Sequence, residues 1–119
     1  MRLTNNDMYK YICTLSECME TTGLLGYAIA RNYRKLLDAA KEYLEAYQKT
    51  LEKYGAEDTN GELRLDCKSE NFQKFIDEIT PLSRIEHNVE IMQVPIKESI
   101  GQLSAKQIVD LDFMLSEAS

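Results

Sequence analysis

The segment YAIARNYRKLLDAAKEYLEAYQKTLEKY, residues 27–54, decides the fold that this sequence predicts. Its apolar and aromatic side chains recur at intervals of three and four residues, which is the period of an amphipathic α-helix. No glycine or proline interrupts it. The positions are Ile29, Tyr33, Leu36, Ala40, Leu44, Tyr47, Leu51 and Tyr54. We therefore predict one continuous helix from Tyr27 to Tyr54.

This helix is too long for a compact domain of the same chain. At about 1.5 Å per residue it makes a rod of roughly 42 Å, whereas a compact chain of 119 residues spans only about 35 Å. The distal half of its apolar stripe, Leu44, Tyr47, Leu51 and Tyr54, therefore needs a cover. Two covers fit the sequence equally well. Either the stripe packs against its copy in a two-fold homodimer, or later helices fold back over it.

A shorter helix is predicted before this rod. Thr4 is a helix N-cap with Asp7 three residues later, and the helical spacing of apolar residues continues to about Glu20. Gly23 and Gly26 then break the pattern. The two helices are expected to form an antiparallel hairpin.

Strand patterns appear twice after the rod. Gly55 ends the long helix and an Asn60-Gly61 turn follows. Leu63–Cys67 alternates apolar and polar residues, and Val89–Val94 is rich in β-forming residues. A single strand cannot stand alone, so we expect these two segments to pair in a small two-stranded sheet.

Two further helices complete the prediction. Ser69 caps the first, where Pro81 leaves open whether the helix kinks or stops. Ser104 and Gln107 form a capping box for the second, which runs from Ala105 to about Ser116. The fold class is α+β, mostly α: one domain, residues 1–119, made of a helical hairpin, a small β element and two further helices. The expected core is Ile12, Leu15, Ile29, Leu36, Leu44, Leu51, Phe72, Phe75, Ile76, Ile79, Ile91, Leu111 and Met114.

Composition narrows the class of partner. The net charge is −6, and acidity disfavours nucleic-acid binding because Lys and Arg contacts to phosphate dominate it. The net charge favours a basic protein partner instead.

No apolar run is long enough for a membrane span, and the polar start of the chain predicts a cytoplasmic protein. Cys13, Cys18 and Cys67 lack zinc-site spacing, and we expect all three to be small buried side chains in a reducing compartment.

The sequence offers little catalytic chemistry. His87 is the single histidine and is expected in a turn with Asn88. Motifs for nucleophile elbows, zinc proteases, phosphate loops and dinucleotide folds are missing. We expect no enzyme activity, no catalytic residues, no metal site and no cofactor.

One charge cluster departs from expectation. Arg31, Arg34 and Lys35 lie near the predicted start of the long helix, where the helix dipole attracts anions and opposes cations. One interpretation is that the two arginines pair with the chain's own carboxylates, for example on the final helix. The others are a contact with a partner protein, or an anion or nucleic-acid site in which Tyr27 and Tyr33 stack on bases. The candidate partner-binding residues are Arg31, Arg34, Lys35, Leu44, Tyr47, Leu51 and Tyr54.

The layout resembles a family of small uncharacterised proteins encoded by phages and prophages of Gram-positive bacteria. The shared features are Leu3-Thr4-Asn5-Asn6-Asp7, Arg31 to Leu37, Lys53-Tyr54-Gly55, Asn60-Gly61, Phe75 to Ile79, Leu82, Glu86, Val89-Glu90-Ile91, Leu103 and Leu111 to Leu115.

The resemblance implies a phage product in the cytoplasm of the bacterial host, with a host or phage protein as its partner. The leading hypothesis is a binding protein that inhibits a host defence protein. The alternatives are a structural or assembly component of the virion, and a small anion- or nucleic-acid-binding module.

Overall fold

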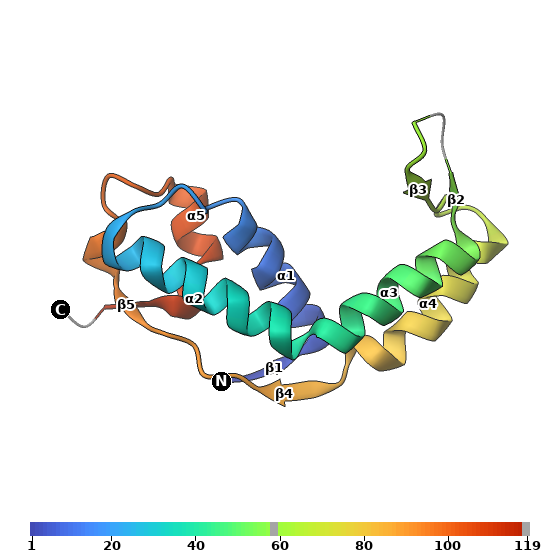
Figure 1. The fold of residues 1–119 in the computed structure, drawn as a ribbon, viewed down its shortest axis with the longest axis horizontal. Helices are drawn as coiled ribbons and strands as arrows, with labels where there is room; N and C mark the ends of the chain where they lie inside the picture. The colour runs from blue at the N-terminus through green and yellow to red at the C-terminus, as the bar shows by residue number, and fades with distance from the viewer. Residues whose placement is uncertain (58–59, 118–119) are drawn as a thin grey trace.

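The chain folds as helices joined by short strands (Figure 1). The computed structural model describes residues 1–57 and 60–117. The helices are α1 (Asn5–Ser16), α2 (Gly23–Ala39), α3 (Lys41–Tyr54), α4 (Glu70–Ser83) and α5 (Ala105–Asp110), with two 3₁₀ turns, η1 (Ile96–Ser99) and η2 (Asp112–Met114). The strands are β1 (Arg2–Thr4), β2 (Ala56–Glu57), β3 (Leu63–Arg64), β4 (Glu86–Asn88), β5 (Val94–Pro95) and β6 (Leu115–Ser116). The predicted class, α+β and mostly α, is confirmed.

The molecule is elongated because it has two apolar cores along its long axis. Its extents are 51 × 32 × 21 Å and its radius of gyration is 16.7 Å, against about 13.5 Å for a compact chain of this length. The larger core lies between α1, α2 and the C-terminal segments. The smaller core, around Tyr43, Phe75 and Ile79, lies between α3 and α4. Leu44 packs against both cores and so joins them.

The predicted continuous helix is wrong in two respects: it bends at Ala40, and its start was placed too late. The helix begins earlier than expected, at Gly23, and α3 leaves α2 in a new direction (Figure 1). The hydrogen bonds continue through the bend, since the Ala40 amide donates to Leu36 and its carbonyl accepts from Leu44, both at 2.9 Å. Ala40 is fully buried. The bend lets α2 follow α1 on one core while α3 follows α4 on the other.

Helix starts agree with their predicted caps. The Thr4 side chain accepts from the Asp7 amide, the Ser69 hydroxyl from Phe72, and Ser104 forms a capping box with Gln107. Helix ends agree less well. The first helix stops at Ser16 rather than Glu20, and the last stops at Asp110 rather than Ser116.

Both expected strands are wrong in extent and pairing. Only Leu63–Arg64 of the first is a strand, and it pairs antiparallel with β2. Only the end of the second is a strand, where β5 pairs in parallel with β6. A third pair was not predicted: β4 runs antiparallel to β1, with Leu3 opposite His87. His87 therefore lies in a strand, not a turn.

A buried side chain explains why Val89–Val94 does not form a strand along its length. The Asn32 amide group, fully buried on α2, donates from Nδ2 to the Met92 carbonyl at 3.0 Å. Its Oδ1 accepts from the Met92 amide at 2.8 Å. These two bonds satisfy the Met92 backbone as a neighbouring strand would, so the middle of the segment lies on α2 without a β partner.

A second buried asparagine contacts the end of α4, ahead of this segment. Asn5 is buried at the start of α1, and its Nδ2 donates to the Leu82 carbonyl at 2.8 Å. Its backbone amide donates to Ile85 at 2.9 Å. Two helices thus hold the connection between α4 and β5.

Pro81 neither stops the helix nor stands at its end. The α4 helix continues two residues further, to Ser83. Proline removes one helical hydrogen bond, and the hydroxyls of Thr80 and Ser83 donate to the Ile76 and Thr80 carbonyls nearby, both at 2.7 Å.

Most of the expected core is buried. The buried positions are Ile12, Leu15, Ile29, Leu36, Phe75, Ile79, Ile91, Leu111 and Met114, while Leu44, Leu51, Phe72 and Ile76 are half-buried.

Replacing Phe75 by Ala should destabilise the protein by about 3–5 kcal/mol, because it leaves a cavity in the smaller core. The Phe75 ring packs edge-on against Tyr47, with 5.3 Å between ring centroids. Urea denaturation measures the loss. Phe72→Ala, a half-buried ring on the same helix, is the matched control and should cost less. Equal losses would contradict the assignment of Phe75 to the core.

Replacing Asn32 by Ala should lower the free energy of unfolding by about 2 kcal/mol, because it leaves two half-buried Met92 backbone groups without their partner. Thermal or urea unfolding measures this change. Asn6→Ala, at an exposed position on α1, is the control and should change stability by less than about 0.5 kcal/mol. Similar effects of the two variants would show that the Met92 contacts do not hold the segment.

Candidate binding surface on α2

The predicted cationic cluster does not lie at a helix start. Because α2 begins at Gly23, Arg31, Arg34 and Lys35 lie in its middle turns. The attraction of a helix N-terminus for anions falls off within the first turn. The dipole argument for an anion site is therefore wrong for these residues.

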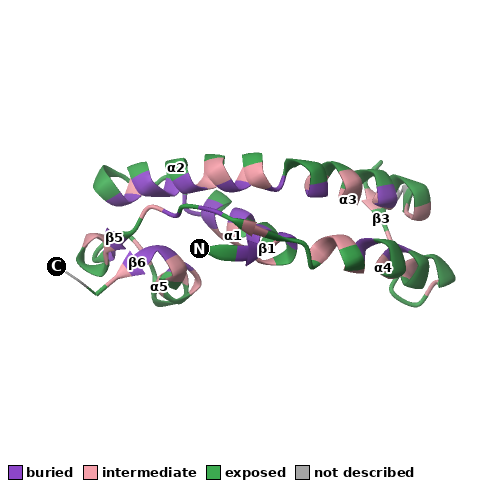
Figure 2. Cartoon of the chain, turned by 90° about the horizontal axis from the view of Figure 1, so that it is seen from below, coloured by how far each residue is buried: buried purple, intermediate pink, exposed green. Residues whose placement is uncertain are grey.

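The cluster lies instead on the outer side of α2, opposite the core. The α2 residues that face the core, among them Ala28, Ile29 and Leu36, are buried, and Figure 2 shows the outer side of this helix as exposed. We call the outward residues Tyr27, Ala30, Arg31, Arg34 and Lys35 the α2 face. They line a shallow open hollow of about 470 Å³.

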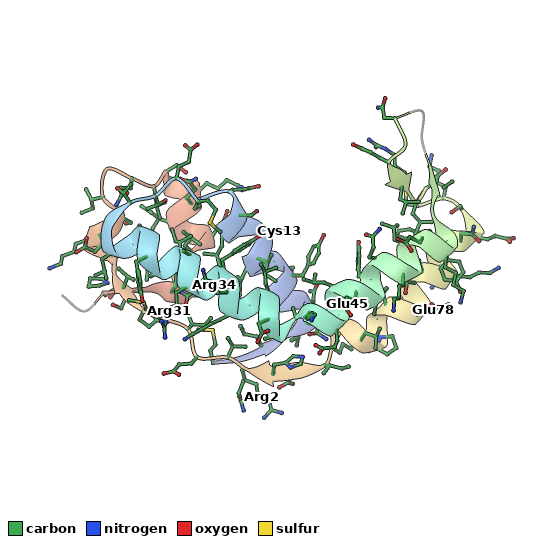
Figure 3. All side chains as sticks on the ribbon, viewed as in Figure 1. Arg2, Cys13, Arg31, Arg34, Glu45 and Glu78 are labelled. Atoms are coloured by element: carbon green, nitrogen blue, oxygen red, sulfur yellow. The ribbon has the colours of Figure 1, made fainter. Side chains whose placement is uncertain are left out.

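The two arginines of the α2 face have no acidic partner in the part of the chain that the structure describes. Figure 3 shows Arg31 and Arg34 along the same helix. Arg31 Nη1 donates to the Tyr27 hydroxyl at 3.5 Å, a long contact, and Lys35 Nζ donates to the Glu90 carbonyl at 2.9 Å. The expected pairing of the arginines with carboxylates of the final helix does not form.

Other cations of the chain do find carboxylates. Lys53 Nζ lies 2.8 Å from a Glu78 carboxylate oxygen, Lys106 pairs with Asp110 at 3.4 Å, and Arg2 pairs with Glu86. The first of these contacts lowers the pKa of Glu78 and raises that of Lys53, chiefly through their hydrogen bond. The α2 arginines therefore differ from these paired cations, whose charges are compensated within the chain.

A second hollow adjoins the α2 face. It has a volume of about 440 Å³ and shares Ala30 and Arg34 with the first; its other lining residues are Ser16, Met19, Tyr33 and Leu37. The Met19 side chain, after α1, is 43% exposed. Sequence analysis named Tyr27 only as a base-stacking residue of the alternative anion site, and it did not include Ala30 or Met19. Tyr27 was recognisable, since it is a large aromatic residue on the polar side of the helical period.

The remaining predicted binding residues are covered within the chain. Leu44, Tyr47, Leu51 and Tyr54 pack against the α3–α4 core. The Tyr54 hydroxyl donates to Glu78 Oε1 on α4 at 2.6 Å, and Tyr47 stacks on Tyr9 of α1 at 5.6 Å between ring centroids. The structure thus follows the second expected arrangement, in which a later helix folds over the stripe. In this arrangement all four side chains of the stripe are half-buried within one chain.

His87, the single histidine of the chain, lies apart from the α2 face. His87 Nε2 is 3.0 Å from Asn5 Oδ1, at a small cavity of about 140 Å³ where the two cores meet. Within residues 1–57 and 60–117, no three His, Cys, Asp or Glu side chains are grouped as metal ligands. In the same ranges no helix is long and apolar enough to cross a membrane.

The cysteines do not all behave as expected. Cys18 is buried, but Cys13 and Cys67 are exposed, so the prediction of three buried thiols is wrong for two of them. The exposed Cys13 lies on α1, as Figure 3 shows. Burial raises the pKa of the Cys18 thiol, and the nearby carboxylates of Glu17 and Asp110 add to this shift.

A thiol reagent such as DTNB should react quickly with Cys13 and Cys67 and slowly with Cys18. The reactive form is the thiolate, and a raised pKa together with burial reduces it at Cys18. Absorbance of the released thiolate follows the reaction. In denaturing urea all three thiols should react at similar rates, and a Cys18→Ala variant should lose only the slow phase. A slow phase that persists in that variant would contradict this assignment.

Comparisons of the chain with protein-family models, curated proteins and solved structures find no match.

Proposed function

We propose that this chain is a non-enzymatic binding protein that contacts a partner protein through the α2 face. The observation that carries the proposal is the composition of that face. An exposed tyrosine, 58% accessible at Tyr27, lies beside two exposed arginines without carboxylate partners in the described chain. Tyrosine and arginine are among the residues that protein interfaces use most and that contribute most to their affinity.

The shape of the surface supports the same function. The α2 face belongs to a helix of 17 residues whose opposite side is anchored in the larger core. A helix held in this way does not have to be ordered on binding, so this chain would lose little conformational entropy when a partner binds there. The adjoining hollow with Met19 extends the surface across to the end of α1.

The resemblance to phage and prophage proteins is the reason for proposing a particular class of partner. We propose that the partner is a defence protein of the bacterial host, that the two proteins meet in the host cytoplasm, and that binding inhibits the partner. A helical surface that occludes a functional site of its target needs no catalytic group of its own.

A photo-crosslinking side chain tests this function. Replacing Tyr27 by p-benzoylphenylalanine in a Gram-positive host, followed by irradiation, should give a covalent adduct with one host protein, identified by mass spectrometry. The matched control carries the same residue at Glu45, an exposed position on the outer side of α3 (Figure 3). An adduct only at position 27 is the expected result. Equal adducts at both positions, or none at position 27, would contradict the proposal. An adduct with a virion protein instead would favour the assembly role.

A further inference from the structure

We propose that the segment bound by the α2 face is an acidic stretch of polypeptide. In this arrangement its carboxylates pair with Arg31 and Arg34, and an apolar side chain between them sits on Ala30. This inference rests on the proposed function, and it adds the chemistry of the partner. The net charge of −6 favours a basic partner, but the local charge at this surface is positive.

The first argument is electrostatic. A partner that covers Arg31 and Arg34 removes water from two guanidinium groups, which is costly unless anions replace that water. Among the described residues the chain supplies no carboxylate to either arginine, although it has 20 acidic side chains. The partner must therefore bring the negative charge.

The second argument is geometric. Residues three apart on a helix share a face, with about 5–6 Å between their Cβ atoms. Arg31 and Arg34 have this spacing, and the Tyr27 hydroxyl contacts Arg31 Nη1 on one side. The planar guanidinium forms two parallel hydrogen bonds to a carboxylate. Ala30 is exposed and lines both hollows, so an apolar side chain between the two carboxylates can pack on it.

Other occupants fit less well. A second copy of the chain would place Arg31 and Arg34 against the same arginines, and like charges across an interface are destabilising. A nucleic acid needs several phosphate contacts for stable binding. Near this face the polyanion would meet Asp38 and Glu90, in a chain that is acidic as a whole. A short segment with a few carboxylates needs fewer ionic contacts, and it meets less of the acidic chain than a polyanion does.

The experiment compares two peptides. The probes are a short peptide of repeating Glu-Glu-Leu units and its counterpart with Gln in place of every Glu. Amide shifts in ¹⁵N-labelled protein locate and measure binding. We expect the acidic peptide to shift the amides of residues 27–35. The Gln peptide should bind about tenfold more weakly or worse, a loss of about 1.4 kcal/mol.

Variants assign the effect to the two arginines. Arg31→Gln combined with Arg34→Gln should weaken the acidic peptide by a similar factor. Lys49→Gln combined with Lys74→Gln removes the same charge from exposed positions on α3 and α4 and should leave binding unchanged. Equal binding of the two peptides, or equal effects of the two double variants, would overturn the proposal. Tighter binding of oligothymidylate to the same amides would also overturn it, in favour of nucleic acid.

The two proposals fail separately. A crosslink at position 27 that persists after Arg31→Gln and Arg34→Gln would keep the binding function and reject the acidic partner. If the acidic peptide binds as expected but no cellular protein is crosslinked, the preference of the α2 face for acidic segments would stand and the proposed binding function would be rejected.

Discussion

The buried amide of Asn32 is the interaction on which the arrangement of the larger core depends. The Asn32 side chain forms hydrogen bonds with both the carbonyl and the amide of Met92. These bonds fix the position along α2 at which residues 89–93 cross the helix. Asn5 fixes the other end of the same connection, through the Leu82 carbonyl and His87. Within the described chain no buried side-chain nitrogen or oxygen lacks a hydrogen-bond partner. A polar network of this kind is stabilising when it is complete and costly when one member is lost.

The bend at Ala40 follows from having two cores rather than one. A straight helix from Gly23 to Tyr54 would follow one axis, whereas the larger core lies under α2 and the smaller one lies between α3 and α4 (Figure 1). Leu44, one turn after the bend, packs on both. The outer side of α2 remains exposed because the core residues all lie on its inner side. The surface that we assign to a partner is therefore a by-product of this packing.

Local chemistry made part of the fold predictable. Thr4, Ser69 and Ser104 each start a helix through a bond to an amide three residues later, and that spacing is visible in the sequence. The bend was not visible, because Ala40 is a good helix former and no glycine or proline marks the site. The pairing of strands could not be predicted for a different reason. The strands β1 and β4 pair across most of the chain length, and no local pattern shows which distant segments meet. The Asn32 side chain bonds the Met92 backbone in place of a strand, and a single asparagine in a helical pattern does not reveal this role. Arg31 and Arg34 were recognised as a cluster, but their exposure depends on where α2 begins and on which side of it faces the core.

The pairing of β1 with β4 has a consequence for synthesis of the protein. Met1 and Val89 exchange two backbone hydrogen bonds, both 2.8 Å long, across 88 positions of sequence. On the ribosome, α1 and α2 are complete long before this partner segment leaves the exit tunnel. Until then their inner sides, with Leu15, Leu25 and Leu36, have only each other for cover. Closing such distant contacts is slow, and exposed apolar surface in a nascent chain is what chaperones recognise. The fold is thus completed only after most of the chain has been translated.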